Sequence, residues 1–163
     1  MDNLALRTKQ ISGLLPKIAI NLRVARLIDE IKPGLTTSQL MVLLTLKEKK
    51  DIAIPVGNLA EQLSVSFPAV SGIVDRLVKE KLIKRRRSGE DRRLVLIELT
   101  NTGKKMVGKL SRAFERLLFD VLKKIPEVER ETIIKAIERV FEFSIALSED
   151  AHGKEVSLPE TAT

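Results

Sequence analysis

The stretch that decides the fold runs from Leu59 to Lys104 and reads LAEQLSVSFPAVSGIVDRLVKEKLIKRRRSGEDRRLVLIELTNTGK. Its apolar residues change period along the way. Over residues 67–81 they recur at steps of three and four, which predicts a helix with one buried face. Two short extended runs at 82–87 and 94–99 then flank a charged loop with one glycine, as in a β-hairpin. This order predicts a helix-turn-helix followed by a β-wing.

The residues before this stretch predict three more helices. A long N-terminal helix carries apolar residues at helical spacing, is kinked at Pro16 and stops at Pro33-Gly34. A second helix follows, capped by one of the threonines at 36–37. A short extended piece at 52–54 then leads to a short third helix, for which Pro55 suits the first position.

The residues after the hairpin predict two long helices. An amphipathic helix starts at Thr100 or Asn101, and Ile125-Pro126 breaks it before the last helix begins. The apolar stripes of the N- and C-terminal helices are too long for the small middle region to cover. We expect these helices to pack on each other or on a second copy of the chain.

Composition excludes most catalytic chemistry. The 163-residue chain has no cysteine and one histidine, His152, near the C-terminus. Thiol chemistry, disulfides and a multi-histidine metal site within one chain are therefore excluded. Glu90 and Asp91 lie in a charged turn with no buried environment to separate their pKa values, so we do not expect a catalytic pair. We expect no enzyme activity, no metal and no cofactor, and no uncharged run is long enough to span a membrane.

The net charge of +7 is concentrated in one place. Residues 79–93 hold eight basic and three acidic side chains, a net +5, whereas the segment from 148 onward carries −3. A helix-turn-helix followed directly by a basic segment is typical of a protein that binds double-stranded DNA. The helix would lie in the major groove, and Arg92 or Arg93 would lie in the adjacent minor groove. Phosphate neutralisation is expected from the three consecutive arginines of the hairpin, Arg85, Arg86 and Arg87.

Four blocks, in this order and spacing, resemble the MarR family of winged-helix transcription regulators. They are LTTSQLMVLLTL at 35–46, VDRLVKEKLIKR at 74–85, DRR at 91–93 and LTNTGK at 99–104. The resemblance covers about residues 35–105, and the flanking helices match in arrangement only. It implies a mainly α-helical fold with a small β-wing, flanked by long dimerisation helices.

The resemblance also implies function. It points to a cytoplasmic homodimer that binds a palindromic operator, most often as a repressor, and is released by a small ligand. On the recognition helix it places six residues at or near the DNA: Ser66, Pro68, Ala69, Ser71, Gly72 and Arg76. Arg93 matches the wing arginine, and Asp91 is expected to orient a neighbouring arginine. Half-sites would be centred about 10 base pairs apart.

The predicted organisation has four parts. Residues 1–35 form the N-terminal dimerisation helix, 36–100 the winged helix-turn-helix, 101–147 the C-terminal dimerisation helices and 148–163 a flexible polar tail. The missing cysteine excludes a thiol-oxidation switch, and one tail histidine argues against zinc sensing. A small apolar or phenolic effector fits, in a pocket that would be aliphatic with a phenylalanine and a basic residue.

Several of these DNA-contact assignments have a purely structural alternative. Ser66 could serve only as an N-cap, and Gly72 could be required for close helix packing instead of DNA approach. Asp75 could pair with a wing arginine, although the pair with Lys79 four residues on is favoured. At the level of function, the alternatives are a regulator without any effector and an architectural module that binds DNA nonspecifically.

Overall fold

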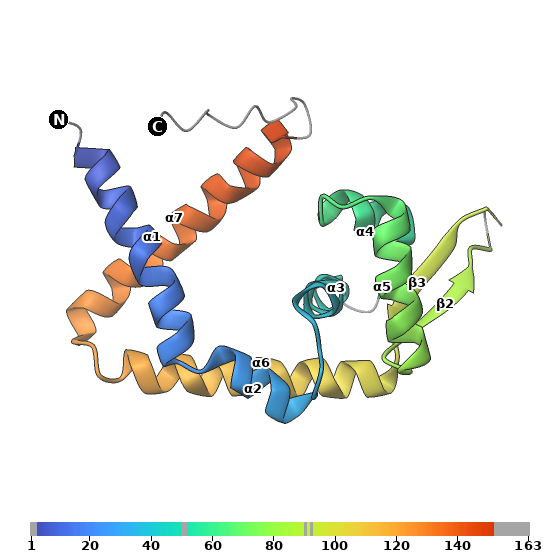
Figure 1. Cartoon of the computed structure of the whole chain (residues 1–163), viewed down its shortest axis with the longest axis horizontal. Coiled ribbons are helices and arrows are strands. Elements are labelled where there is room, and N and C mark those ends of the chain that lie inside the picture. Colours follow the sequence, from blue (N-terminus) through green and yellow to red (C-terminus); the bar gives the residue numbers. More distant parts are fainter. Residues whose placement is uncertain (1–2, 50–51, 90, 92, 152–163) are drawn as a thin grey trace, which may run out of the picture. The chain divides into compact units, whose positions relative to one another are not determined.

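The computed structural model describes residues 3–49, 52–89, 91 and 93–151, and the side chains of 148–151 are left aside (Figure 1). The elements are α1 (Asn3–Asn21), α2 (Val24–Ile31), α3 (Thr37–Glu48), β1 (Ile54–Pro55), α4 (Val56–Gln62), α5 (Phe67–Lys79), β2 (Ile83–Arg87), β3 (Val95–Leu99), α6 (Asn101–Leu122) and α7 (Glu127–Ala151). The predicted fold class, mainly α-helical with a small β-wing, is confirmed. The chain divides into two compact units, Met1–Leu117 and Leu118–Thr163.

Helix α3 begins at a reciprocal cap. The Thr36 hydroxyl accepts a hydrogen bond from the Gln39 backbone N–H at 3.2 Å, and the Thr36 backbone N–H donates to Gln39 Oε1 at 2.9 Å. This arrangement satisfies two backbone donors that a helix start otherwise leaves without partners. The predicted cap at 36–37 is therefore confirmed, with Thr36 as the N-cap.

The core of the first unit lies under the helix-turn-helix. Apolar side chains of α3, α4, α5, the sheet and the first half of α6 pack into one cluster. Its members without measurable exposure are Val42, Leu43, Leu59, Val70, Val74, Leu77, Ile97, Val107 and Leu110. Burying one such side chain contributes about 1.5–3 kcal/mol. This cluster therefore holds α5 in place from beneath and leaves its other face in solvent.

The short extended piece predicted at 52–54 contributes a third strand, β1, to the wing. β2 and β3 pair antiparallel, from Ile83 opposite Leu99 to Arg87 opposite Val95. The short β1 pairs with the other edge of β3, so the strand order is β1-β3-β2. Pro55 belongs to β1 and is the N-cap of α4, not its first residue as predicted. The extended backbone was predicted but its pairing with β3 was not, because a strand of two residues carries no periodicity.

The predicted single N-terminal helix is wrong. The break falls at Leu22-Arg23, where Arg23 adopts a left-handed backbone with φ of 51°, and it divides the segment into α1 and α2. Pro16 lies inside α1. A left-handed arginine is uncommon and has no signature in the sequence, whereas proline is the expected helix breaker.

Close packing joins the end of α5, the start of β2 and the start of α6. α5 ends at Lys79, two residues before the predicted end, because Lys81 takes a left-handed backbone with φ of 59°. The Thr100 hydroxyl donates to the Lys81 carbonyl at 2.7 Å. A Cβ added to Gly103 would lie 2.0 Å from the Leu82 carbonyl oxygen, so this contact requires glycine.

In the second unit, Arg130 of α7 caps the preceding helix. Its guanidinium donates to the carbonyls of Leu122 and Ile125 at 2.9 and 2.8 Å, and the Leu122 carbonyl also accepts the Ile125 backbone N–H at 3.0 Å. Lys123 donates a hydrogen bond to Asp120 at 2.8 Å and lowers the pKa of that carboxyl. α7 continues to Ala151, past the predicted start of the tail, and the rest of that segment, with His152, lies outside the described residues.

Helices α1 and α7 keep their apolar side chains in solvent. α1 has no buried residue, and none of the described side chains of α7 is buried. On α1 the exposed apolar side chains include Ile11, Leu14, Leu15 and Ile18; on α7 they include Val128, Ile137, Val140, Phe141, Phe143 and Leu147. Within its own unit, each helix thus presents an apolar surface that nothing covers.

Candidate nucleic-acid interface

The N-terminal half of α5 is open to solvent. Ser66 caps the helix, its hydroxyl accepting from the Ala69 backbone N–H at 3.4 Å, and Pro68 occupies the first turn. Ser66, Pro68 and Ala69 are exposed and Ser71 is half-buried. A helix start with small exposed residues allows close approach of another surface. The capping role that was weighed for Ser66 is confirmed.

Gly72 meets nothing within the chain. A Cβ built on this residue has no neighbour within 4 Å beyond the helix's own local backbone. The packing explanation for Gly72 is therefore wrong for the isolated chain. Arg76, one turn further along α5, is also exposed.

Arg85 of β2 is bound to the recognition helix. Its guanidinium lies 2.6 Å from the Asp75 carboxylate and donates to the Ser71 carbonyl at 3.4 Å. The favoured pairing of Asp75 with Lys79 is therefore wrong, because Asp75 reaches across to the wing. These contacts join α5 to the hairpin that Figure 1 shows beside it.

The other strand arginines lie in a different environment. Arg86 and Lys84 share the Glu98 carboxylate of β3, at 3.6 and 3.3 Å. Both basic side chains are more than half exposed, so these pairs are weak and give way readily to another anion. Arg87, at the end of β2, is exposed. Their positive charge is therefore available to a polyanion.

Hydrogen bonds within the wing loop set its shape. The Asp91 carboxylate accepts from the Arg93 backbone N–H at 2.9 Å, and the Asp91 backbone N–H donates to the Ser88 hydroxyl at 3.4 Å. Asp91 therefore contacts the backbone of Arg93 and fixes the turn from which that exposed side chain projects. Arg92 and Glu90 lie outside the described residues.

A polar link connects α2, α3 and the end of α5. Gln39, only 4% exposed, donates to Glu80 at 3.3 Å, and Lys32 lies 2.8 Å from the other oxygen of the same carboxylate. Glu80 is the C-cap residue of α5. No pattern in the sequence indicates this link, because Gln39 and Lys32 are 41 and 48 residues from Glu80.

Two exposed apolar residues at the start of α5 escaped the prediction. Phe67 is 58% exposed and Val65, in the preceding turn, is 40% exposed. Phe67 has the spacing of the buried stripe, three residues before Val70, and therefore looks like core in the sequence. The core ends at Val70, so the first helical residue projects beyond it.

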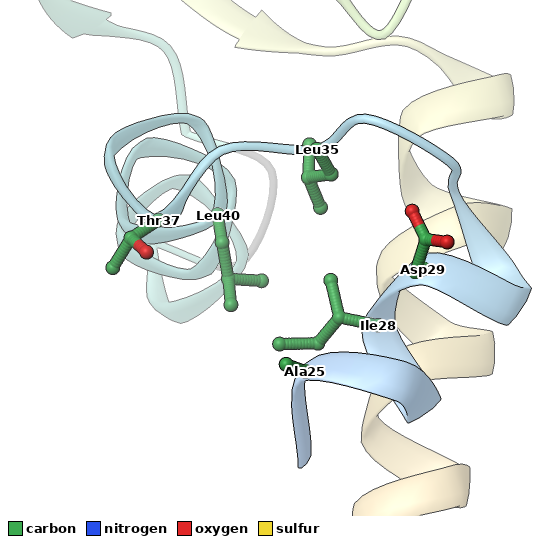
Figure 2. Close-up of a pocket in the computed structure, with 6 residues that line it drawn as sticks. All are labelled: Ala25, Ile28, Asp29, Leu35, Thr37 and Leu40. Carbon is green, nitrogen blue, oxygen red and sulfur yellow. The ribbon is translucent and has the colours of Figure 1, made fainter. Parts of the chain in front are cut away.

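A small cavity lies between α2 and α3. Its volume is about 140 Å³, and its lining residues are Ala25, Ile28, Asp29, Leu35, Thr37 and Leu40. Figure 2 shows the side chains of Ile28, Leu35 and Leu40 directed into the same space. The Asp29 carboxylate accepts the Gly34 N–H at 3.1 Å. This lining contains neither the phenylalanine nor the basic residue expected of an effector pocket.

The described part of the chain contains neither a candidate membrane span nor a candidate metal site. There, no helix combines the length and apolarity that crossing a bilayer requires. In the same residues, no three or more carboxylate or histidine side chains gather where they could hold a metal ion.

Residues 35–95 match the model of the MarR family. Among curated proteins, the HTH-type transcriptional repressor YetL of Bacillus subtilis (strain 168) is 26% identical over 109 residues, 67% of this chain and 65% of YetL. The matched part thus spans slightly less than two thirds of that relative. Its name, like those of the other curated relatives, is that of a transcriptional regulator and not of an enzyme.

Solved structures share the fold over most of the chain. The crystal structure of RV1404 from Mycobacterium tuberculosis has a TM-score of 0.76 at 22% identity, covering 88% of this chain and 95% of that one. The crystal structure of Streptococcus pneumoniae FabT in complex with DNA has a TM-score of 0.72 at 19% identity, covering 86% and 99%.

Proposed function

Since this chain belongs to the MarR family of winged-helix regulators, we propose that it binds double-stranded DNA as a homodimeric transcription regulator, most plainly a repressor. The observation that carries the proposal is the connection of α5 to a basic wing through Arg85. A recognition helix and a wing held in one orientation can enter adjacent grooves of one duplex.

The exposed start of α5 is proposed to enter the major groove. Five residues are proposed to lie at or near the bases: Ser66, Pro68, Ala69, Ser71 and Gly72. Arg76 is proposed to contact the DNA backbone. The absence of a neighbour around Gly72 supports this placement, since the helix surface there is free to approach DNA closely.

The wing is proposed to supply the electrostatic contacts. Arg93, on the turn shaped by Asp91, would enter the minor groove, with Arg92 beside it in sequence. Arg86 and Arg87 would neutralise phosphates. Arg85 has two partners on α5, so its proposed part is to position the wing and only secondarily to add charge.

The proposed dimer uses the apolar surfaces of α1 and α7. Each large apolar side chain that a second copy covers contributes about 1.5–3 kcal/mol. A two-fold symmetric dimer presents two recognition helices to a palindromic operator with half-sites about one helical turn apart. The division into residues 1–35, 36–100 and 101–147 is retained as part of this proposal.

The cavity of Figure 2 is proposed to take the effector. A cavity of about 150 Å³ holds a molecule of benzene size, which is close to the volume found here. The Asp29 carboxylate repels an aromatic acid and accepts a hydrogen bond, so a neutral phenol fits better than a benzoate. Thermal shift with phenol and with benzoate tests this, and stabilisation by benzoate alone contradicts it.

The function is tested by selecting bound duplexes from random DNA in the presence of excess nonspecific competitor. We expect enrichment of a palindrome, and equal competition by random DNA would favour the architectural alternative.

On the selected operator, Arg93→Ala should weaken binding about tenfold or more while the dimer persists. Lys135→Ala removes one positive charge from α7 and should leave operator affinity within about twofold.

A further inference from the structure

The reading face of α5 lacks the side chains that distinguish bases by paired hydrogen bonds. From residue 66 to residue 75 the sequence is SFPAVSGIVD, without arginine, lysine, asparagine, glutamine or histidine. Bidentate recognition of guanine needs arginine or lysine, and that of adenine needs asparagine or glutamine. The helix therefore needs another way to recognise bases in the major groove.

The same helix start exposes apolar surface. Phe67 is 58% exposed and Val65 is 40% exposed, and the neighbouring Pro68 and Ala69 are exposed as well. These four residues form what we call the apolar tip. Phe67 is the first helical residue, and the Cα–Cβ bonds of a helix tilt toward its N-terminus. Phe67 therefore lies exposed at the end of the helix that a recognition helix presents to base edges.

The two hydroxyls at this end of the helix, those of Ser66 and Ser71, offer single hydrogen bonds and no bidentate pair. The Ser66 hydroxyl accepts the Ala69 N–H, and Ser71 is half-buried, with its carbonyl accepting from Arg85. A serine hydroxyl can pair with either kind of base, so the groups on this surface that can discriminate are an aromatic ring and small aliphatic groups. In the major groove the apolar partner for such groups is the C5-methyl of thymine.

We propose that the apolar tip, with Phe67 at its centre, reads thymine through its C5-methyl group. The inference rests on the proposed function and adds the base class that α5 recognises. Each half-site should therefore place one or more thymines under the tip. Covering one methyl group corresponds to about a three- to fivefold change in affinity, and two half-sites give about tenfold or more.

Deoxyuridine provides the test, because it lacks only the methyl group and keeps the hydrogen-bonding pattern of thymine. The operator obtained by selection is synthesised in two forms, with thymine and with deoxyuridine in both half-sites. We expect the unchanged protein to bind the deoxyuridine form about tenfold more weakly. Phe67→Ser should bind both forms with affinities within about twofold of each other.

The control is Arg93→Ala, which should lower affinity for both forms and keep the tenfold difference between them. Since Phe67 is exposed, its replacement should leave the midpoint of thermal unfolding nearly unchanged. Equal binding of the two forms by the unchanged protein would overturn the thymine inference while leaving DNA binding intact. A change of oligomeric state in Phe67→Ser, with discrimination preserved, would instead assign the tip to a protein contact and overturn the inference too. Failure to enrich any operator would refute the proposed function itself.

Discussion

The winged helix and the terminal helices differ in how far they bury their apolar side chains. Both carry apolar stripes at helical spacing, yet Leu77 of α5 is fully buried whereas Leu15 of α1 is 61% exposed and Ile137 of α7 is 63% exposed. The winged helix completes its core within one chain. The terminal helices do not, within the units to which they belong. An apolar stripe therefore specifies a helix with a surface to cover, and the surrounding chain decides what covers it.

Removing core volume should break the winged helix most severely. Leu77→Ala leaves a cavity among fully buried neighbours and should lower the free energy of unfolding by about 3–5 kcal/mol. Urea unfolding measures this. Leu15→Ala, studied below the dissociation constant of the dimer, should change the same quantity by less than about 0.5 kcal/mol. Equal costs would place α1 in the core of the single chain.

A charge on the apolar surface of α7 should break the association of chains instead. Ile137→Asp should raise the dissociation constant of the dimer at least about 100-fold, because an aspartate would be buried without a partner. Sedimentation equilibrium measures the constant, and circular dichroism checks that the helices persist. The control Arg139→Asp introduces the same group two residues further along α7, on the opposite side of the helix. An equally strong effect of the control would point to charge and not to apolar contact.

Two glycines sharpen the difference between a closed and an open surface. Gly103→Ala forces a Cβ against the Leu82 carbonyl and should cost about 1–3 kcal/mol of stability. Gly72→Ala meets nothing and should stabilise α5 by about 0.5–1 kcal/mol, since alanine favours helix. Operator affinity should nevertheless fall for Gly72→Ala. Thermal unfolding and DNA binding measured together separate the two effects, and unchanged affinity would remove Gly72 from the interface.

The smallest effect concerns the backbone at Lys81. Its left-handed conformation costs a side-chain-bearing residue about 1–2 kcal/mol. Lys81→Gly removes that cost but makes the unfolded chain more flexible, so we expect a net gain of about 0.5–1 kcal/mol by thermal unfolding. Lys79→Gly, at the last residue of α5, should instead lose stability, by up to about 1 kcal/mol. A loss in both variants would show that the side chain of Lys81 matters more than its backbone.

Prediction from sequence succeeded where the determinants are local. The cap at Thr36 and the break at Ile125-Pro126 depend on neighbours a few residues apart, and both are found. The hairpin loop and the start of α5 at Ser66 are equally local. The fold class was also predicted, through the family resemblance, because the order of the four sequence blocks is more specific than any single block.

The misses depend on contacts across the fold. Asp75 pairs with Arg85 ten residues away instead of with its helical neighbour, because the wing folds back along α5. The strand β1 exists only because β3 offers an edge. Phe67 fits the buried stripe in the sequence, and only the extent of the core shows that it lies outside. Of the candidate DNA-contacting residues, all but Arg92 are described, and their contacts with DNA remain predictions.

The link through Glu80 has an energetic consequence. Lys32 and Glu80 have side chains about one third exposed, and an ion pair in such a position contributes no more than about 1 kcal/mol. A ligand shifts the orientation of a helix only by the difference in its affinity for the two orientations, and a tenfold difference corresponds to about 1.4 kcal/mol. Anything that binds beside α2 and prefers a different orientation of that helix can therefore break the link without approaching the free energy needed to unfold the core. The ion pair at the end of the recognition helix is therefore weak enough to break when a ligand binds, and its two partners fix the position in which it forms again.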